Sequence, residues 1–477
     1  MQNQNQKQVD ILLINPPSPD NSIIIRDFNR SGRTSKERIV WPQISLAYLA
    51  AMVPENLTVE IIDCIAENIK WPELTDILKK KKPRYLASQV ITSTLHNDLK
   101  IFQEIKKINP KTITMTMGPH ATALTEKTLL ENSELDFIFT YEPEKTFAEL
   151  ITNIENSKNN FQSIKGLAYK ENDEVIMNEK RDYIINLDEL PIPRHDLLPL
   201  KKYVFPFMAS SFTFVVPSRG CPFPCTFCRQ PVMWAKKFRS RSVESILKEL
   251  KFIKNLGINE FIFQSDTFTV DKNIVIDLCK KMIDEKLNFK WSTNSRVDTV
   301  DEEMLAWMKK AGCWMIAFGI ESGSQKVLDK AKKGITLEQI RTTINLTDKI
   351  GIKIYGYFII GLIKETKETI RETINLAKEL PITFAIFHTA APYPGTEFYE
   401  EVKKNGWLTS EKWEDINQGT TAPINYPNLS SKEINKGIKK AYRKFYFRPK
   451  AVIRILKSLK NIRDINGIIK AAINQLF

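Results

Sequence analysis

The first 150 residues alternate short apolar runs with amphipathic stretches, a pattern of strands and helices taking turns along the chain. Strand-length apolar runs occur at residues 9–15, 58–63, 85–92, 112–117 and 136–140. Stretches with helical periodicity occur at residues 42–53, 72–82 and 95–108. This alternation predicts a parallel sheet with helices on both faces. We therefore expect an α/β fold whose N-terminal part, residues 1–150, is a doubly wound, Rossmann-like domain.

The turns after these strands carry small and polar residues. In doubly wound sheets, ligands bind beyond the carboxyl ends of the strands, so these turns are the expected binding edge. The candidate binding residues there are Asn15, Asp63, Thr92, Ser93, Gly118, His120 and Glu142.

A second βα alternation begins near residue 206, after a connector at residues 151–205 that contains a predicted hairpin and a Pro-rich boundary. Its strand-like runs lie at residues 212–217, 260–264, 290–296, 314–321, 353–361 and 385–390. Six strands with intervening helices predict a partial (β/α)₆, TIM-like barrel over residues 206–410. Residues 411–477 are expected to form a basic, helical C-terminal region.

Composition narrows the class of protein. The chain has 477 residues and a net charge of +14, but residues 432–470 hold thirteen Lys/Arg against two acids, a balance of +11. The excess positive charge is therefore concentrated near the C-terminus and does not form a basic groove across the whole protein. We accordingly expect no nucleic-acid partner. The polar N-terminus leads us to expect no signal peptide, and no apolar run approaches the roughly 20 residues needed to span a bilayer. We expect a cytoplasmic protein in a reducing compartment.

Three of the six cysteines lie close together, at Cys221, Cys225 and Cys228, in a C-x₃-C-x₂-C spacing. Thiolates are soft ligands that suit iron–sulfur clusters, and three of them leave one iron of a [4Fe-4S] cubane open for chemistry. The alternatives are a zinc knuckle, which needs four ligands, or a reduced loop without metal. The remaining three, Cys64, Cys279 and Cys313, sit in apolar surroundings and are expected to be buried thiols.

This cysteine loop resembles the signature of the radical S-adenosylmethionine (SAM) enzymes. The resemblance implies that Cys221, Cys225 and Cys228 hold a catalytic [4Fe-4S] cluster whose open iron binds SAM, and that Phe227 lies near the adenine. It also implies that Asp266 meets the amino group of SAM, that Arg296 pairs with its carboxylate and that Glu321 accepts from the ribose. The alternative for both Arg296 and Glu321 is a structural salt bridge at the barrel rim.

The N-terminal domain, placed directly before such a barrel, resembles the cobalamin-binding domain of one large class of these enzymes. The similarity rests on residues 41–50, 118–122 and 141–144, and it implies that the candidate residues of the binding edge contact cobalamin. Ile65 stands where cobalamin mutases carry the histidine that ligates cobalt from below. His120 is expected to line the cofactor, or else to be a solvent-facing turn residue.

The class resemblance implies a function. We expect an enzyme that methylates an unactivated carbon, in which one SAM yields a 5′-deoxyadenosyl radical and a second methylates cobalamin. The alternatives are an oxidative cyclase of the anaerobic chlorophyll pathway type, which belongs to the same class, and a non-catalytic cobalamin or redox sensor. The class implies a small-molecule substrate and a low-potential electron donor such as flavodoxin or ferredoxin.

Two regions after the barrel strands add detail. The segment Gly361-Leu-Ile-Lys-Glu-Thr departs from the Gly-Leu-Pro-Gly-Glu-Thr usual in the class, while His388 and Tyr393 are expected at the substrate cavity or in packing. The C-terminal basic segment, residues 449–463, has an apolar stripe beside a basic one. Such a helix either contacts the inner face of an anionic membrane, which would suit a lipophilic substrate, or packs on the barrel.

Overall fold

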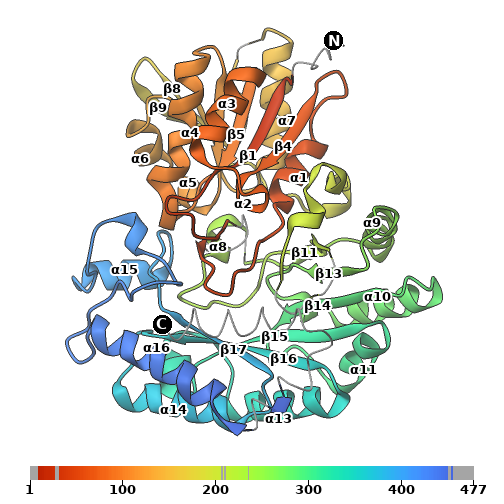
Figure 1. Ribbon diagram of the computed structural model, residues 1–477, viewed down its shortest axis with the longest axis vertical. Helices are drawn as coiled ribbons and strands as arrows, with labels where there is room; N and C mark the ends of the chain where they lie inside the picture. Colours follow the sequence, from red (N-terminus) through yellow and green to blue (C-terminus); the bar gives the residue numbers. More distant parts are fainter. Residues whose placement is uncertain are drawn as a thin grey trace. The chain divides into compact units, whose positions relative to one another are not determined.

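The computed structural model describes residues 9–26, 32–158, 160–205, 208, 211–234, 236–449 and 453–454. The chain divides into two compact units (Figure 1). The first comprises Met1–Gly32, Val40–Ile184 and Glu189–Lys202, and the second comprises Arg33–Ile39, Ile185–Asp188 and Tyr203–Phe477. Residues 33–39 therefore belong to the second unit, although the sequence places them among the strands and helices of the first.

The first unit is built on a seven-stranded sheet in the order β4-β1-β5-β6-β7-β8-β9. The first five strands in this order are parallel, and β8 and β9 form the predicted hairpin, which joins the sheet antiparallel to β7. The strands are β1 (Ile11–Asn15), β4 (Val59–Asp63), β5 (Tyr85–Gln89), β6 (Ile113–Met117), β7 (Phe137–Phe139), β8 (Leu167–Glu171) and β9 (Glu174–Met177). Every residue of β1 and β5 is buried, as expected for central strands covered on both faces.

Helices cover both faces of this sheet: α3 packs beside α4, and α1 packs beside α7 (Figure 1). The helices are α1 (Ile44–Ala51), α2 (Cys64–Glu67), α3 (Trp71–Lys81), α4 (Leu95–Ile108), α5 (Pro119–Ala123), α6 (Thr125–Leu130) and α7 (Pro143–Glu155). The strand order reverses between β1 and β5, and such a switch point opens a crevice at the carboxyl ends of the strands.

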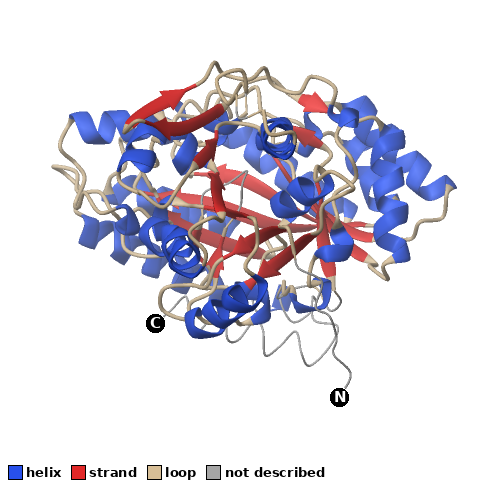
Figure 2. Ribbon diagram, turned by 90° about the horizontal axis from the view of Figure 1, so that it is seen from above, coloured by secondary structure: helices blue, strands red, loops and turns tan. Residues whose placement is uncertain are grey.

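The second unit is built on a six-stranded parallel sheet in the sequential order β10-β13-β14-β15-β16-β17. These strands are β10 (Phe212–Val215), β13 (Glu260–Phe263), β14 (Lys290–Ser295), β15 (Cys313–Glu321), β16 (Lys353–Ile360) and β17 (Phe384–Thr389). Crossover helices follow the strands and flank the sheet (Figure 2). They are α9 (Val243–Asn255), α10 (Lys272–Asp284), α11 (Glu302–Lys310), α13 (Leu337–Ile350) and α14 (Lys367–Glu379).

The starts of these helices are set by local sequence. Ser242 accepts a hydrogen bond from the Ser245 amide at the start of α9, and Asp301 accepts one from the Met304 amide at the start of α11. Such caps satisfy amides that have no partner within the helix. Shorter elements complete the unit: β11 (Ser218–Arg219), β12 (Arg239–Ser240), α8 (Gln230–Met233), α12 (Gln325–Lys330) and α15 (Glu397–Lys404).

The last strand, β17, is an edge of the sheet and is covered by α16 (Ser431–Tyr446). Tyr442 accepts a hydrogen bond from the Phe387 amide. Tyr446 accepts one from the Ala385 amide and donates one to the Ala385 carbonyl. The two phenols thus bond backbone groups that an edge strand would otherwise leave open to pairing with another chain.

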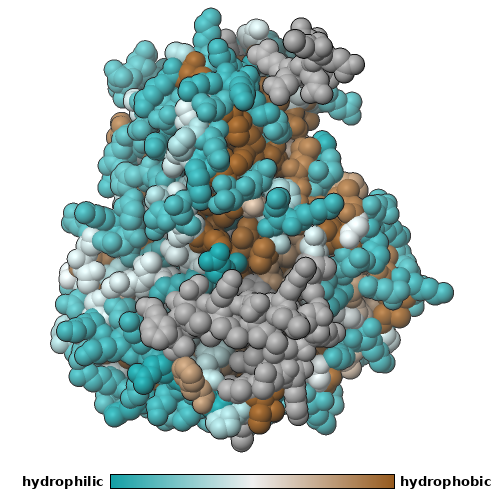
Figure 3. Space-filling view, viewed as in Figure 1, coloured by the Kyte–Doolittle hydropathy of each residue, from teal (hydrophilic) through white to brown (hydrophobic). Residues whose placement is uncertain are grey.

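The fold class predicted from the sequence is confirmed: a doubly wound α/β domain precedes a partial parallel barrel and a C-terminal helix, α16. Cys64, Cys279 and Cys313 are buried, as predicted. Of the C-terminal basic segment, most residues lie outside those described. Among the described helices, none is both long and apolar enough to cross a membrane, and hydrophilic side chains cover much of the described surface in the view of Figure 3.

Candidate functional site

The three clustered cysteines lie on a loop that leaves the carboxyl end of β10. The short antiparallel pair β11–β12 closes the base of this loop by pairing Ser218–Arg219 with Arg239–Ser240. Gly220 adopts a φ of +86°, and its amide donates to Asp266 Oδ2 at 3.2 Å. Asp266 follows β13, the neighbouring strand, so one predicted site residue holds the backbone of the loop that carries the others.

Segments that follow other strands of the sheet also contact this loop. The Thr226 amide donates to the Ala331 carbonyl at 3.0 Å, and the Thr226 carbonyl accepts from the Phe398 amide at 3.0 Å. Cys221 Sγ lies 3.5 Å from Thr267 Oγ1. These contacts bring the cysteine loop to the carboxyl end of the parallel sheet, which is where barrel enzymes build their active sites. Phe227 is half-buried on this loop.

Arg296, just after β14, lies against the cysteine loop. Its Nη1 is 3.7 Å from Cys225 Sγ, and its guanidinium lies 3.6 Å from the centroid of the Phe223 ring. Its Nε and Nη2 both donate to Asp298 at 2.8 Å, and Nη2 also donates to the Lys333 carbonyl. Burial would lower the pKa of Arg296, but the bonds to Asp298 outweigh burial and raise that pKa. Arg296 thus forms the salt bridge considered as its alternative role, with Nη1 toward the cysteines.

Glu321 ends β15 with a φ of +65°, a conformation that costs a non-glycine residue energy and that clusters at functional sites. Its Oε1 accepts from Lys333 Nζ at 2.8 Å, and both side chains are nearly inaccessible. Burial would lower the pKa of Lys333, but the charge of Glu321 raises it, and Cys225 contributes in the same direction. A buried cation is therefore held beside the thiols, although Glu321 also forms the salt bridge named as its alternative role.

The donor set of the loop suits an iron–sulfur cluster. None of its cysteines is in a disulfide. Burial raises the pKa of Cys221 and of Cys228, so deprotonation of these thiols is coupled to metal binding. Among the described residues, no three His, Cys, Asp or Glu side chains converge on a point that would hold a single metal ion. A [4Fe-4S] cubane does not require the three thiols to meet at one point, because each cysteine binds a different iron.

In the first unit, the predicted binding residues lie at the carboxyl edge of the sheet. Asn15 Nδ2 donates to Asp63 Oδ1 at 2.6 Å. That same oxygen accepts from the amides of Ile65 and Ala66 and so caps α2, which carries no histidine. Asn15 Oδ1 in turn accepts from Arg26 at 3.0 Å.

A second cluster at this edge surrounds the end of β6. His120 Nδ1 lies 3.1 Å from Thr92 Oγ1, and both residues are buried, so His120 is not a solvent-facing turn residue. Gly118 has a φ of +121°, and a Cβ there would come within 2.8 Å of the Val90 carbonyl oxygen. Polar groups buried at strand ends fit a polar cofactor, and Ser88 Oγ, one residue before the end of β5, is buried with no hydrogen-bond partner among the described residues.

The other two predicted binding residues of this unit are engaged by backbone. Ser93 donates to the Gly32 carbonyl at 3.2 Å, and Glu142 Oε2 accepts from the Ile184 amide at 2.7 Å. Both side chains are buried and anchor connecting segments. Their contacts neither require nor exclude a cofactor.

Sequence reasoning missed three charged residues. Arg26 and Asp98 form a fully buried ion pair at 2.7 Å, and Arg26 also donates to the Pro16 carbonyl. Lys333 pairs with Glu321. Arg26 lies in a stretch without periodicity, Asp98 has the spacing of an ordinary helix residue, and Lys333 stands in a run of lysines, so nothing in the local pattern distinguished them.

The two residues expected at the substrate cavity, His388 and Tyr393, have different surroundings in the structure. Tyr393 is almost fully buried, with the Arg229 guanidinium 4.6 Å from its ring centroid, which is a packing role. His388, at the end of β17, lines a pocket within the second unit.

Comparison with known proteins agrees with this architecture. Residues 215–377 match the family model of the radical SAM superfamily, and residues 35–151 match that of the B12 binding domain. The chain is 37% identical to an uncharacterized methyltransferase of Pyrococcus horikoshii, over 98% of both chains. It is 27% identical to the anaerobic magnesium-protoporphyrin IX monomethyl ester cyclase of Cereibacter sphaeroides, over 86% of this chain and 67% of the relative.

One solved structure extends the likeness to the whole fold. The cobalamin-dependent SAM radical enzyme OxsB, with aqua-cobalamin and SAM bound, superposes with a TM-score of 0.74 at 18% identity. The match covers 97% of this chain and 70% of OxsB.

Proposed function

This chain belongs to the radical SAM superfamily, in the class whose members carry a B12-binding domain, and we propose that it transfers a methyl group to an unactivated carbon of a small molecule. The observation that carries the proposal is the whole-length similarity to a relative named as a methyltransferase, in a chain that holds both domains. We assign the cobalamin domain to residues 1–150 and the radical SAM barrel to residues 206–410.

We assign the cluster to Cys221, Cys225 and Cys228. The bound cluster and SAM supply a 5′-deoxyadenosyl radical, and the cobalamin carries the methyl group. The role of the protein is to bind, to orient and to exclude water. The bond from the Gly220 amide to Asp266 fastens the start of the cysteine loop, so Asp266 would help to orient the thiols.

SAM is assigned to the carboxyl ends of β13, β14 and β15. Arg296 faces the cysteines with Nη1, which lies 3.7 Å from Cys225 Sγ, while Asp298 fixes Nε and Nη2. Its guanidinium is therefore already oriented for a carboxylate beside the cysteines. Glu321, held by Lys333, is assigned to the ribose hydroxyls, and Phe227 to the adenine. Lys333, although paired with Glu321, also interacts favourably with the charge of Cys225, and such an interaction would favour a thiolate-ligated cluster.

Cobalamin is assigned to the binding edge of the first unit, formed by Asn15, Asp63, Thr92, Ser93, Gly118, His120 and Glu142. The support is their burial after the carboxyl ends of the parallel strands, on both sides of the switch point of a doubly wound sheet. Because α2 carries Ile65 and no histidine, this helix would offer bound cobalamin no imidazole.

The second candidate is an oxidative cyclisation, which the 27% identity to the magnesium-protoporphyrin cyclase favours. The two reactions differ in the fate of SAM. Methyl transfer consumes two SAM molecules per product and yields both 5′-deoxyadenosine and S-adenosylhomocysteine, whereas cyclisation yields no S-adenosylhomocysteine.

The test is incubation of the anaerobically purified protein with methyl-deuterated SAM, a low-potential donor such as flavodoxin or ferredoxin, and porphyrin and lipid candidates. Methyl transfer puts deuterium in the product and forms the two SAM fragments in comparable amounts. Accumulation of 5′-deoxyadenosine without S-adenosylhomocysteine, in the presence of a substrate that is consumed, would replace this proposal with the cyclase.

A further inference from the structure

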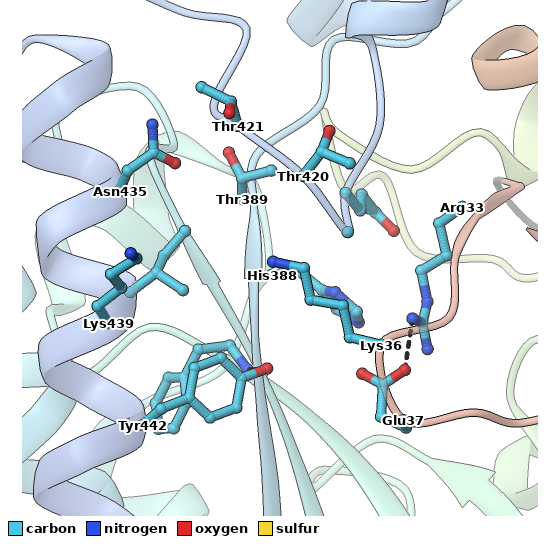
Figure 4. Close-up of a pocket in the computed structure, with 14 residues that line it drawn as sticks. Arg33, Lys36, Glu37, His388, Thr389, Thr420, Thr421, Asn435, Lys439 and Tyr442 are labelled. Atoms are coloured by element: carbon cyan, nitrogen blue, oxygen red, sulfur yellow. Dashed lines mark hydrogen bonds and ion pairs between the residues drawn. The ribbon is translucent and has the colours of Figure 1, made fainter. Parts of the chain in front are cut away.

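A pocket of about 440 Å³ lies within the second unit, around the carboxyl end of β17 (Figure 4). Three segments distant in sequence form it: residues 33–37, residues 418–421 and one side of α16. The side chain of Asn417 fixes the first of these segments, because Nδ2 donates to Thr34 Oγ1 at 2.9 Å and Oδ1 accepts from the Thr34 amide at 3.2 Å. A volume of this size accommodates part of a small molecule.

The charged groups of the pocket do not balance. Arg33 and Glu37 form an ion pair at 2.8 Å and cancel each other (Figure 4). Lys36 and Lys439 remain, and neither forms an ion pair with any residue that the structure describes. Burial lowers the pKa of Lys36, the charge of Glu37 raises it in part, and the charge of Lys439 lowers it. Two ammonium groups therefore line one cavity.

The neutral groups of the pocket can form hydrogen bonds but carry no negative charge that would balance the two lysines. Thr389, Thr420 and Asn435 line it with hydroxyl and amide groups (Figure 4). Burial lowers the pKa of His388 to about 3, and Arg33 contributes, so the imidazole is neutral at physiological pH. The net charge of the lining thus comes from the two lysines.

We propose that this pocket binds an oxyanion, a phosphate or carboxylate group carried by the methyl acceptor. An oxyanion between Lys36 and Lys439 would relieve their repulsion and form charge-assisted hydrogen bonds. As a statement about the substrate, the inference rests on the proposed function; as a binding site, it stands on the pocket alone.

The pocket also lies at the same end of the sheet as the cysteine loop. The cysteine loop follows β10 and the pocket surrounds the end of β17, the two edge strands of one parallel sheet. The segment after β17 reaches that loop, because the Phe398 amide donates to the Thr226 carbonyl at 3.0 Å. A methyl acceptor whose oxyanion lies in the pocket would therefore extend toward the cysteine loop.

The test measures binding of inorganic phosphate, and separately of succinate, to the anaerobically purified full-length protein by isothermal titration calorimetry. The variants are Lys36→Met, Lys439→Met and the double variant. The control is Lys440→Met, which removes an exposed lysine of α16 that does not line the pocket. All of these side chains are exposed enough for the fold to tolerate the change.

We expect the double variant to weaken binding of the preferred anion at least about tenfold, the loss of one good charge-assisted contact, while the control stays within about twofold. Preference for phosphate or for succinate identifies which oxyanion the substrate carries. Binding of neither anion, or an equal loss in Lys440→Met, would overturn the proposal. Anion binding that depends on both lysines, together with failed deuterium transfer, would instead count against methyl transfer alone.

Discussion

The buried Arg26–Asp98 pair should stabilise the binding edge of the first unit, and replacing Arg26 by Met tests this. Both side chains are fully inaccessible, and the guanidinium meets Asp98 through three N···O contacts of 2.7 to 3.2 Å. Removing one partner of a buried pair leaves an uncompensated charge and costs about 3–5 kcal/mol. That is a large share of the roughly 5–15 kcal/mol that stabilises a typical domain.

The companion variants separate charge from packing. Asp98 also accepts from Thr94 Oγ1 at 2.7 Å, and an asparagine could keep that bond. The double variant Arg26→Met/Asp98→Asn carries no buried charge, so it should recover about 1–3 kcal/mol relative to Arg26→Met. Lys79→Met is the control, because Lys79 pairs with Asp76 at the surface and such pairs contribute about 0–1 kcal/mol.

Hydrogen exchange measured by mass spectrometry reports the first unit separately from the second. A loss of 3–5 kcal/mol corresponds to exchange about a hundredfold to a few thousandfold faster in the peptides covering β5 and α4. Lys79→Met should leave these peptides within about threefold of the wild type. If Arg26→Met behaves like Lys79→Met, or if the double variant is less protected than Arg26→Met, the buried pair is not what holds this edge together.

Four further outcomes are expected. Anaerobic reconstitution should load about four irons per chain, and a variant with Cys221, Cys225 and Cys228 all changed to Ala should lose the iron and SAM cleavage; a retained cluster would contradict the assignment. Bound cob(II)alamin should give an electron paramagnetic resonance spectrum without axial nitrogen splitting, because Ile65 replaces the histidine; resolved nitrogen splitting would show another ligand. Burial raises the pKa of Glu365 from 4.5 to about 7. The Glu365 carboxyl therefore ionises at a lower pH in the unfolded chain than in the folded protein. This difference should reduce the free energy of unfolding by up to about 3 kcal/mol as the pH rises from 4.5 to 7. Urea unfolding should show this loss, Glu365→Gln should abolish it, and an unchanged pH profile in that variant would refute it. Through its C-terminal basic segment, the protein should sediment with liposomes only when they contain anionic lipid, and less so in salt, since the screening length is about 10 Å at 0.1 M. Equal recovery of the protein in the supernatant with and without anionic lipid would refute this membrane contact.

Much of the architecture follows from the sequence alone, because the signals are local. Strands such as β1 and β16 are mainly apolar runs, and their alternation with amphipathic helices suffices to predict two parallel sheets. The three cysteines are spaced within eight residues, so their grouping needs no tertiary information. Predicted strand bounds were also close: residues 353–361 were expected, and β16 spans Lys353–Ile360.

Only the tertiary structure decided which charges meet. Arg26 and Asp98 are 72 residues apart, and Lys333 lies 12 residues beyond Glu321 in a run of lysines, so no periodicity marks either pair. Residues 33–37 join a pocket with α16, some 400 residues later in the chain. Local pattern reports burial and helical or strand period, whereas an ion pair or a pocket depends on which surfaces the fold brings together. For that physical reason the sequence indicated the cofactors, while the buried pairs and the anion pocket became visible only in three dimensions.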